Sequence, residues 1–170
     1  MISPPSNQIL PHTLAPPPGL RHCRTVLDIG AGVRPMQWYT AERHVCLEPF
    51  PPYCQVLAAA GYTVIESPAP DGLEVMRLLG REYEAVYLLD VIEHIGKDSG
   101  RRTLELAQQL AMVQVVVYTP DGFKEQAQDV WGYGGDYWQT HRSGWAEADF
   151  PGWRVFRPSP GALFAVWDRP

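Results

Sequence analysis

The sequence predicts an α/β protein whose centre is a doubly wound, mainly parallel sheet of seven strands. Short, nearly continuous apolar runs alternate with helix-like segments between residues 25 and 118, which is typical of parallel strands covered on both faces. The first run enters a glycine turn at residues 30–32. Two further apolar runs, 153–156 and 162–167, are joined by the turn 157–161, so we expect them to close the sheet as an antiparallel pair.

Each element follows from its local pattern. The parallel strands are expected at 25–29, 44–47, 62–65, 85–89 and 113–118. The helices are expected at 35–41, 53–60, 71–79 and 97–110. Pro35 suits the first turn of the first helix, and Asp71 suits the N-cap of the third. Gly61 and Gly80 are placed to end the second and third helices.

Two segments differ in composition from this pattern. Six of the first twenty residues are prolines, so residues 1–22 are expected to form an extended arm that either lies across the domain or frays. Residues 23–170 are expected to form a single domain. Within it, residues 121–150 are rich in glycine, tryptophan and tyrosine and carry no long periodic element. This aromatic loop is expected to be either a lid over a ligand or a satellite core.

Composition narrows the classes of function. The formal net charge of −5 and the lack of a basic stripe disfavour a nucleic-acid partner. Cys23, Cys46 and Cys54 show no C-x-x-C spacing, so neither a disulfide framework nor a zinc site is indicated. No secretory signal pattern and no apolar run of about 18 residues is visible, and we expect a cytoplasmic protein without a membrane span. The sequence leaves the oligomeric state open.

The glycine turn carries the first functional signal. Asp28 precedes Gly30 by two residues, and Glu48 ends the second strand. A dinucleotide-binding G-x-G-x-x-G would need glycine at position 35, where this chain has proline. An acid at the end of the second strand can accept hydrogen bonds from both ribose hydroxyls, and an acid before the turn suits an ammonium group. These residues favour a pocket for an adenosine with an amino-acid tail, and the alternative is an ordinary strand-to-helix turn.

The same residues resemble a known family. The run 26–32, V-L-D-I-G-A-G, resembles the first motif of class I S-adenosylmethionine (SAM)-dependent methyltransferases. The run 85–94, ending in D-V-I-E-H, resembles the fourth-strand motif of that family, and 115–120 resembles its fifth strand. The resemblance covers roughly residues 24–120. It departs from the family at Arg34-Pro35, where a third glycine is missing.

The resemblance implies a Rossmann-like methyltransferase sheet whose last strand pair is antiparallel. It also implies that SAM is the methyl donor and S-adenosylhomocysteine (SAH) the product. A T-P-x-G-F turn at 119–123 and the stretch W-Q-T-H-R-S-G-W at 138–145 are similar to those of small bacterial methyltransferase-like proteins. The cofactor-binding residues that the family implies are Asp28, Gly30, Ala31, Gly32, Glu48 and Asp90.

Two histidines are candidates for a general base on the acceptor side. His94 follows the fourth strand and His141 lies in the aromatic loop, so both should lie at the carboxyl end of the sheet. Each can instead be a structural histidine. Asp90, Glu93 and His94, together with the later histidine, are also similar to the metal site of small-RNA 2′-O-methyltransferases and quinone O-methyltransferases. A divalent metal is therefore an alternative, which the sequence alone does not favour.

The predicted function is SAM-dependent methyl transfer to an oxygen or nitrogen of a small molecule or saccharide. Two alternatives stay open: a non-catalytic binding protein with a methyltransferase fold, and, less favoured because of the acidic charge, an RNA methyltransferase. The sequence does not name the acceptor.

Overall fold

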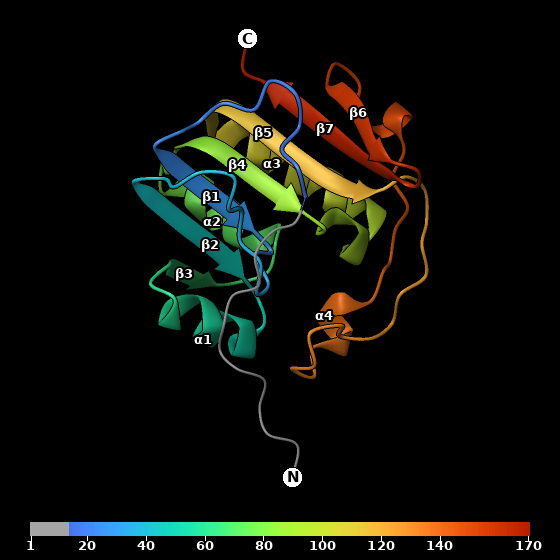
Figure 1. Ribbon diagram of the computed structural model, residues 1–170. Coiled ribbons are helices and arrows are strands. Elements are labelled where there is room, and N and C mark those ends of the chain that lie inside the picture. Colours follow the sequence, from blue (N-terminus) through green and yellow to red (C-terminus); the bar gives the residue numbers. More distant parts are fainter. Residues whose placement is uncertain (1–13) are drawn as a thin grey trace.

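The computed structural model describes residues 14–170 and shows one twisted sheet with helices on both faces (Figure 1). Between these residues the sheet has seven strands in the order β3-β2-β1-β4-β5-β7-β6. This confirms the predicted fold class. The strands are β1 (Thr25–Ile29), β2 (Arg43–Glu48), β3 (Thr63–Glu66), β4 (Tyr83–Leu89), β5 (Ala111–Pro120), β6 (Arg154–Ser159) and β7 (Ala162–Asp168).

The first five strands are parallel, and β7 pairs antiparallel with both β5 and β6. β1 lies between β2 and β4, so Asp28 stands opposite Cys46 on one side and Tyr87 on the other. Because the parallel strands run in the same direction, the carboxyl ends of β1, β2 and β4 meet at one edge of the sheet.

The two faces of the sheet are covered differently. On one face, α2 (Asp71–Leu78) and α3 (Lys97–Leu110) pack on alternate side chains of the central strands. On the other face, α1 (Pro51–Ala59) covers only the β2 side, against Cys46 and Ala31. The rest of that face is covered by chain without helical structure, as Figure 1 shows for the segment before β1.

The helix predicted at 35–41 is absent, and an irregular segment connects β1 to β2. The Asp28 carboxylate accepts a hydrogen bond from the backbone N–H of Met36, which fixes the chain across the sheet. Trp38 then packs edge-on against Tyr87, and the hydroxyls of Tyr39 and Tyr87 lie 2.7 Å apart. Packing of these aromatic side chains on the sheet therefore overrides the local helical pattern.

Residues 14–22, the described part of the predicted arm, lie on the same face. The indole Nε1 of Trp38 donates to the carbonyl of Leu14 at 2.7 Å. Gln114 on β5 donates through Nε2 to the carbonyl of Gly19 at 3.1 Å. This part of the arm is thus held by hydrogen bonds to the domain, and residues 1–13 lie outside the described residues.

The start of α2 differs in one detail from the prediction. Asp71 is not the N-cap of α2: it is the first helical residue, behind Pro70, and no side chain caps this helix. Its carboxylate still lies in the first turn, where negative charge is favoured.

The aromatic loop contains α4 (Asp136–Gln139), which Figure 1 shows beyond the carboxyl ends of the parallel strands, and a short 3-10 turn (Glu147–Asp149). No helix between residues 14 and 170 combines the length and apolarity that a bilayer span requires.

Candidate functional site

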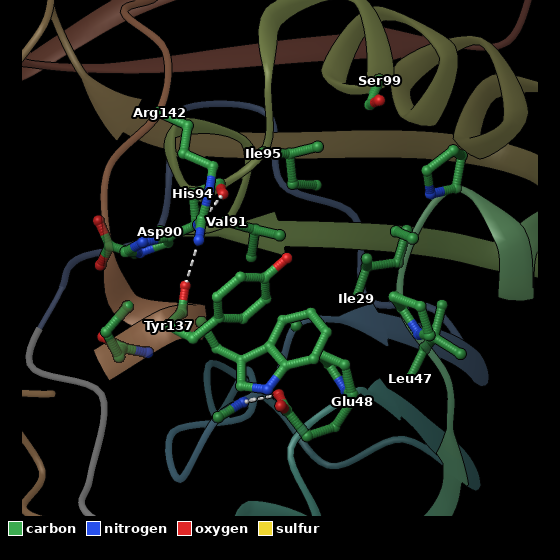
Figure 2. A pocket seen from close by; sticks show the side chains of 18 of the residues that line it. Ile29, Leu47, Glu48, Asp90, Val91, His94, Ile95, Ser99, Tyr137 and Arg142 are labelled. Carbon is green, nitrogen blue, oxygen red and sulfur yellow. Dashed lines mark hydrogen bonds between the residues drawn. The ribbon is translucent and has the colours of Figure 1, made fainter. Parts of the chain in front are cut away.

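Two adjoining cavities open at the carboxyl ends of β1, β2 and β4. The larger, shown in Figure 2, has a volume of about 330 Å³ and is bounded by the glycine turn, the end of β2 and α4. The smaller, of about 190 Å³, is lined by the glycine turn, Arg34, His141 and the start of the aromatic loop. Residues that line both cavities are Gly30, Gly32, Asp90, His94 and Gln139.

The glycine turn lines both cavities. Gly30 and Gly32 have φ angles of +61° and +57°, a region that favours glycine. A Cβ on Gly30 would lie 2.8 Å from a methyl group of Val91, whereas a Cβ on Gly32 would meet no atom within 4 Å. A side chain at position 30 would therefore clash with Val91, whereas the space beside Gly32 is open to a ligand. Ala31 lines the smaller cavity and packs with its buried side chain towards α1.

Glu48 at the end of β2 joins the glycine turn to the start of α1. Its carboxylate accepts from the N–H of Gly32 at 2.8 Å and from the N–H of Phe50 at 3.0 Å. The residue is only 3% exposed, and this burial raises the pKa of its carboxyl to about 7. Each carboxylate oxygen can accept more than one hydrogen bond, so Glu48 can also accept from ligand hydroxyls in the larger cavity that it lines.

Asp28 does not line either cavity. Its buried carboxylate accepts from the N–H of Met36 and lies 3.2 Å from Nε2 of His44. Asp28 therefore holds the chain that follows the glycine turn, and its charge reaches Glu48, whose pKa it raises further. The acid that faces the cavities at this point is Asp90.

Asp90 follows β4 and adopts the left-handed conformation, with φ +57°, which is uncommon outside glycine and typical of functional sites. Its N–H donates to the carbonyl of Tyr118 on β5 at 2.9 Å. Burial raises the pKa of the Asp90 carboxyl to about 6, although the positive charges of Arg34 and Lys124 act in the opposite direction. Glu93 is fully enclosed, and burial together with the charge of Asp90 raises its pKa to about 8.

The two predicted histidines meet at the smaller cavity. The rings of His94 and His141 lie 4.6 Å apart in an edge-to-face arrangement. Nδ1 of His141 lies 2.5 Å from the carbonyl oxygen of Lys124. A carbonyl can only accept, so Nδ1 carries the proton and Nε2 keeps the free lone pair. Glu93 accepts a hydrogen bond from the Thr119 hydroxyl beside them.

Both imidazoles are held in the neutral form. Burial lowers the pKa of His94 to about 4, and burial also lowers the pKa of His141. Nδ1 of His94 is buried without a hydrogen-bond partner, which is rare for a polar atom. One ligand atom from each of Glu93, His94 and His141 lies within 4.8 Å of the others. A carboxylate and two neutral imidazoles are a donor set that divalent transition metals accept, and a neutral imidazole also serves as a general base.

The first half of the aromatic loop lies over these cavities. Tyr137 and Trp138 on α4 line the larger cavity, beside the guanidinium group of Arg142. Arg142 donates to the carbonyls of His94 at 2.8 Å, Thr140 at 2.9 Å and Tyr137 at 2.6 Å, and Figure 2 shows this side chain between His94 and Tyr137. These bonds fix α4 to the residues that follow β4.

Asp129 fixes the same part of the loop to α1. Its carboxylate accepts from the hydroxyl of Tyr53 at 2.6 Å and from the backbone N–H groups of Trp131, Tyr133 and Gly135. These bonds hold the pKa of Asp129 below its usual value despite partial burial. Tyr53 itself lines the larger cavity, so the loop and the cavity wall share one hydrogen-bonded unit.

The second half of the loop belongs to the core. The Trp145 side chain is 1% exposed and donates to the carbonyl of Ile92 at 3.1 Å. Lys97 on α3 lies 3.9 Å from the centre of its ring and donates to the carbonyl of Gly144 at 2.6 Å and to Asp149 at 2.7 Å. The loop is therefore divided into a part over the cavities and a part packed against α3.

Sequence reasoning placed Gly30, Gly32, Glu48, Asp90 and the two histidines at one edge, and the structure brings these residues to the two cavities. It did not identify Arg34, Tyr53 or Asp129 as site residues. The run D-V-W-G-Y-G-G at 129–135 held a signal for Asp129, since an acid before closely spaced glycines often accepts backbone N–H groups in a turn.

Comparison with known proteins supports the fold. The sequence matches no protein-family model and no curated protein. Magnesium protoporphyrin IX methyltransferase from Synechocystis PCC 6803 with bound SAM is similar in structure, with a TM-score of 0.59 and 14% identity over 87% of this chain and 71% of that chain. The DhpI–SAH complex has the same TM-score and 17% identity, over 85% of this chain and 76% of that chain. The methyltransferase domain of the bacterial protein CtHen1 has a TM-score of 0.54 and 13% identity, over 86% of this chain and 91% of that chain.

Proposed function

We propose that this protein is a SAM-dependent methyltransferase that acts on an oxygen or nitrogen of a small molecule or saccharide. The observation that carries the proposal is the geometry around Glu48: a buried carboxylate, hydrogen-bonded to the open glycine turn, lines a cavity of about 330 Å³ at the carboxyl ends of parallel strands. This is the place where open α/β sheets bind nucleosides.

The larger cavity suits an adenosine. Leu47, Pro49, Pro68 and Val91 supply apolar contacts for the base, while Glu48 accepts from the ribose hydroxyls. Between residues 30 and 40 the turn is followed by a single basic residue, Arg34, which is fewer cations than a pyrophosphate site usually has. The likeness in fold to structures with bound SAM and SAH agrees with this choice of ligand.

The pair of histidines, His94 and His141, suits the acceptor side of the reaction. Methyl transfer needs an acceptor lone pair in line with the sulfonium carbon–sulfur bond, so positioning supplies much of the rate. His141, neutral and free at Nε2, takes the proton of an acceptor hydroxyl as the methyl group is transferred. The protonated His141 then returns this proton to solvent.

The test is a calorimetric titration of the purified protein with SAH, followed by measurement of SAH release from SAM in the presence of candidate hydroxylated acceptors. We expect saturable binding of SAH at one site, with no binding of NAD⁺. Absence of SAH binding would refute the proposal. Binding without turnover on any acceptor would favour the non-catalytic alternative, and turnover on RNA alone would favour an RNA methyltransferase.

A second candidate is methyl transfer assisted by a divalent metal, and the convergence of Glu93, His94 and His141 favours it. The orphaned Nδ1 of His94 and the oriented Nε2 of His141 fit a metal, because both are neutral nitrogen atoms with a lone pair. A bound metal would lower the pKa of an acceptor hydroxyl.

The metal candidate is tested by titrating the chelator-treated protein with Co²⁺ and recording its visible absorption spectrum. We expect one equivalent to bind, and we expect His141→Gln to reduce the affinity. If neither Co²⁺ nor Zn²⁺, Mn²⁺ or Mg²⁺ binds and chelator leaves turnover unchanged, the two histidines act without a metal.

A further inference from the structure

Arg34 occupies the position at which the glycine turn departs from the methyltransferase pattern, and its surroundings are unusual. Its guanidinium carbon lies 4.2 Å from the ring centre of Trp131 in the aromatic loop. Its Nε is buried and has no hydrogen-bond partner. Across residues 14–170, Arg34 makes no ion pair within 4.0 Å. A buried guanidinium donor without an acceptor is costly, so this group is suited to an anion from outside the chain.

Asp90 lies in the same cavity and carries the opposite charge. Both residues line the smaller cavity, and the charge of Arg34 favours the ionised form of Asp90. The two side chains nevertheless form no ion pair, so a gap separates the cation from the anion. Lys124 adds a second positive charge to this cavity, but its side chain is exposed and its field is therefore screened more strongly.

A ligand that carries an ammonium and a carboxylate on one carbon matches this pair of groups. The cavity with Arg34 adjoins the larger cavity, since Gly30, Gly32 and Asp90 line both. A nucleoside whose ribose contacts Glu48 would extend its 5′ substituent past these glycines. We propose that Arg34 and Asp90 form a clamp for the α-amino-acid end of the donor, in which Arg34 binds the carboxylate in a forked geometry and Asp90 accepts from the ammonium group. This inference rests on the proposed function.

The clamp extends into the aromatic loop. Trp131 covers one face of the Arg34 guanidinium, and the backbone N–H of Trp131 donates to Asp129 at 2.8 Å. Asp129 in turn accepts from the hydroxyl of Tyr53, which lines the larger cavity. The guanidinium is thus packed from one side by the loop, and its edge is left for the carboxylate. A donor with an intact amino-acid tail would thereby contact Arg34, which packs against Trp131 of the aromatic loop. A nucleoside without the tail would contact only Glu48 and its neighbours.

The experiment compares two ligands that differ only at the tail. SAH carries the amino-acid group, and 5′-methylthioadenosine has the same adenosine and sulfur without it. Both are titrated calorimetrically into the wild-type protein, Arg34→Met and Asp90→Asn. Met keeps an apolar side chain next to Trp131, and Asn tolerates the positive φ of position 90. Arg43→Met is the matched control, because Arg43 also stacks on an aromatic ring, that of Tyr83, away from both cavities.

We expect the wild-type protein to bind SAH at least about 10-fold more tightly than 5′-methylthioadenosine. Arg34→Met should lower the affinity for SAH by about 10- to 100-fold and leave that for 5′-methylthioadenosine nearly unchanged. Arg43→Met should change neither. Equal affinities of the wild-type protein for both ligands, or an equal loss of both in Arg34→Met, would overturn the clamp. If the wild-type protein binds neither ligand, the proposed function itself fails, and the clamp fails with it.

Discussion

The raised pKa of Glu48 makes a sharp prediction about the pH dependence of donor binding. Burial holds the pKa of this carboxyl at about 7 in the free protein. The ribose hydroxyls donate to the ionised form, so binding of SAH should favour loss of the proton. At pH 6, one unit below that pKa, only about a tenth of the molecules carry the ionised carboxylate. The affinity for SAH should therefore be about 10-fold lower at pH 6 than at pH 8.

The assay is calorimetric titration with SAH at several pH values, in pairs of buffers with different ionisation enthalpies. At pH 6 we expect Glu48 to release close to one proton for each SAH bound, and at pH 8 close to none. Asp90 has a pKa of about 6, so it also titrates in this range, and a variant must separate the two groups. Glu48→Gln serves this purpose, because it removes the titration of Glu48 and leaves Asp90 in place.

In Glu48→Gln, the single amide oxygen can accept from only one of the N–H groups of Gly32 and Phe50, which bind different carboxylate oxygens, and the amide cannot supply two charge-assisted bonds to the ribose. Loss of one such bond costs about 1.5–3 kcal/mol, which corresponds to a roughly 10- to 100-fold lower affinity at pH 8. The step in affinity near pH 7 should disappear. A wild-type affinity for SAH that stays constant between pH 6 and 8, or a variant with wild-type affinity, would refute the assignment of Glu48 to the ribose.

Three further predictions concern stability and catalysis. Because the folded protein binds the Glu48 proton more tightly than the unfolded chain (pKa about 7 against 4.5), Glu48 should lower the free energy of unfolding by up to about 3 kcal/mol as the pH rises from 4.5 through 7. Urea melts measure this share as the difference between wild type and Glu48→Gln, in which the remaining fall comes from Asp90 and Glu93. Gly100→Ala places a Cβ 2.5 Å from the ring of Trp145 and should destabilise the fold by about 1–3 kcal/mol in the same melts, whereas Gly96→Ala, where a Cβ meets no atom within 4 Å, should show no such clash penalty. His141→Gln should lower methyl transfer by roughly 100-fold with little change in SAH affinity or Tm; normal turnover with a lower Tm would make this histidine structural.

The sheet was predictable because its signal is local. Each central strand is a run of apolar residues, and the alternation of strands with helices determines the parallel arrangement. The segment 35–41 was not predictable in the same way. Its sequence allows a short helix. The hydrogen bond from the N–H of Met36 to Asp28 and the packing of Trp38 and Tyr39 on β4 instead stabilise an irregular conformation. Those contacts depend on which residues the fold places opposite the segment, and a local pattern does not contain that information.

The candidate site shows the same division. Gly30, Gly32, Glu48 and Asp90 follow strands whose carboxyl ends must meet, so their proximity follows from the predicted topology. Asp28 belongs to the same motif, yet its carboxylate contacts the N–H of Met36 and Nε2 of His44 and does not line either cavity. The roles of Tyr53 and Asp129 depend on a contact across 76 positions of the sequence, which no local spacing predicts.

Under the proposed function, the arrangement of charges would separate the donor from the acceptor. Around the glycine turn, Arg34 and Asp90 present opposite charges to a zwitterion, and Glu48 presents a carboxylate to hydroxyl groups. His94 and His141 lie beside them but are kept neutral by burial, so they do not compete with the ammonium group for Asp90. A sulfonium placed between these sets would be attracted by the carboxylate of Asp90 and not repelled by either imidazole. The acceptor, in contrast, would meet a free nitrogen lone pair. Under the proposed function, charged groups would bind the donor and neutral groups would activate the acceptor. The two sets would meet at Asp90 and His94, the two residues after β4 that line both cavities.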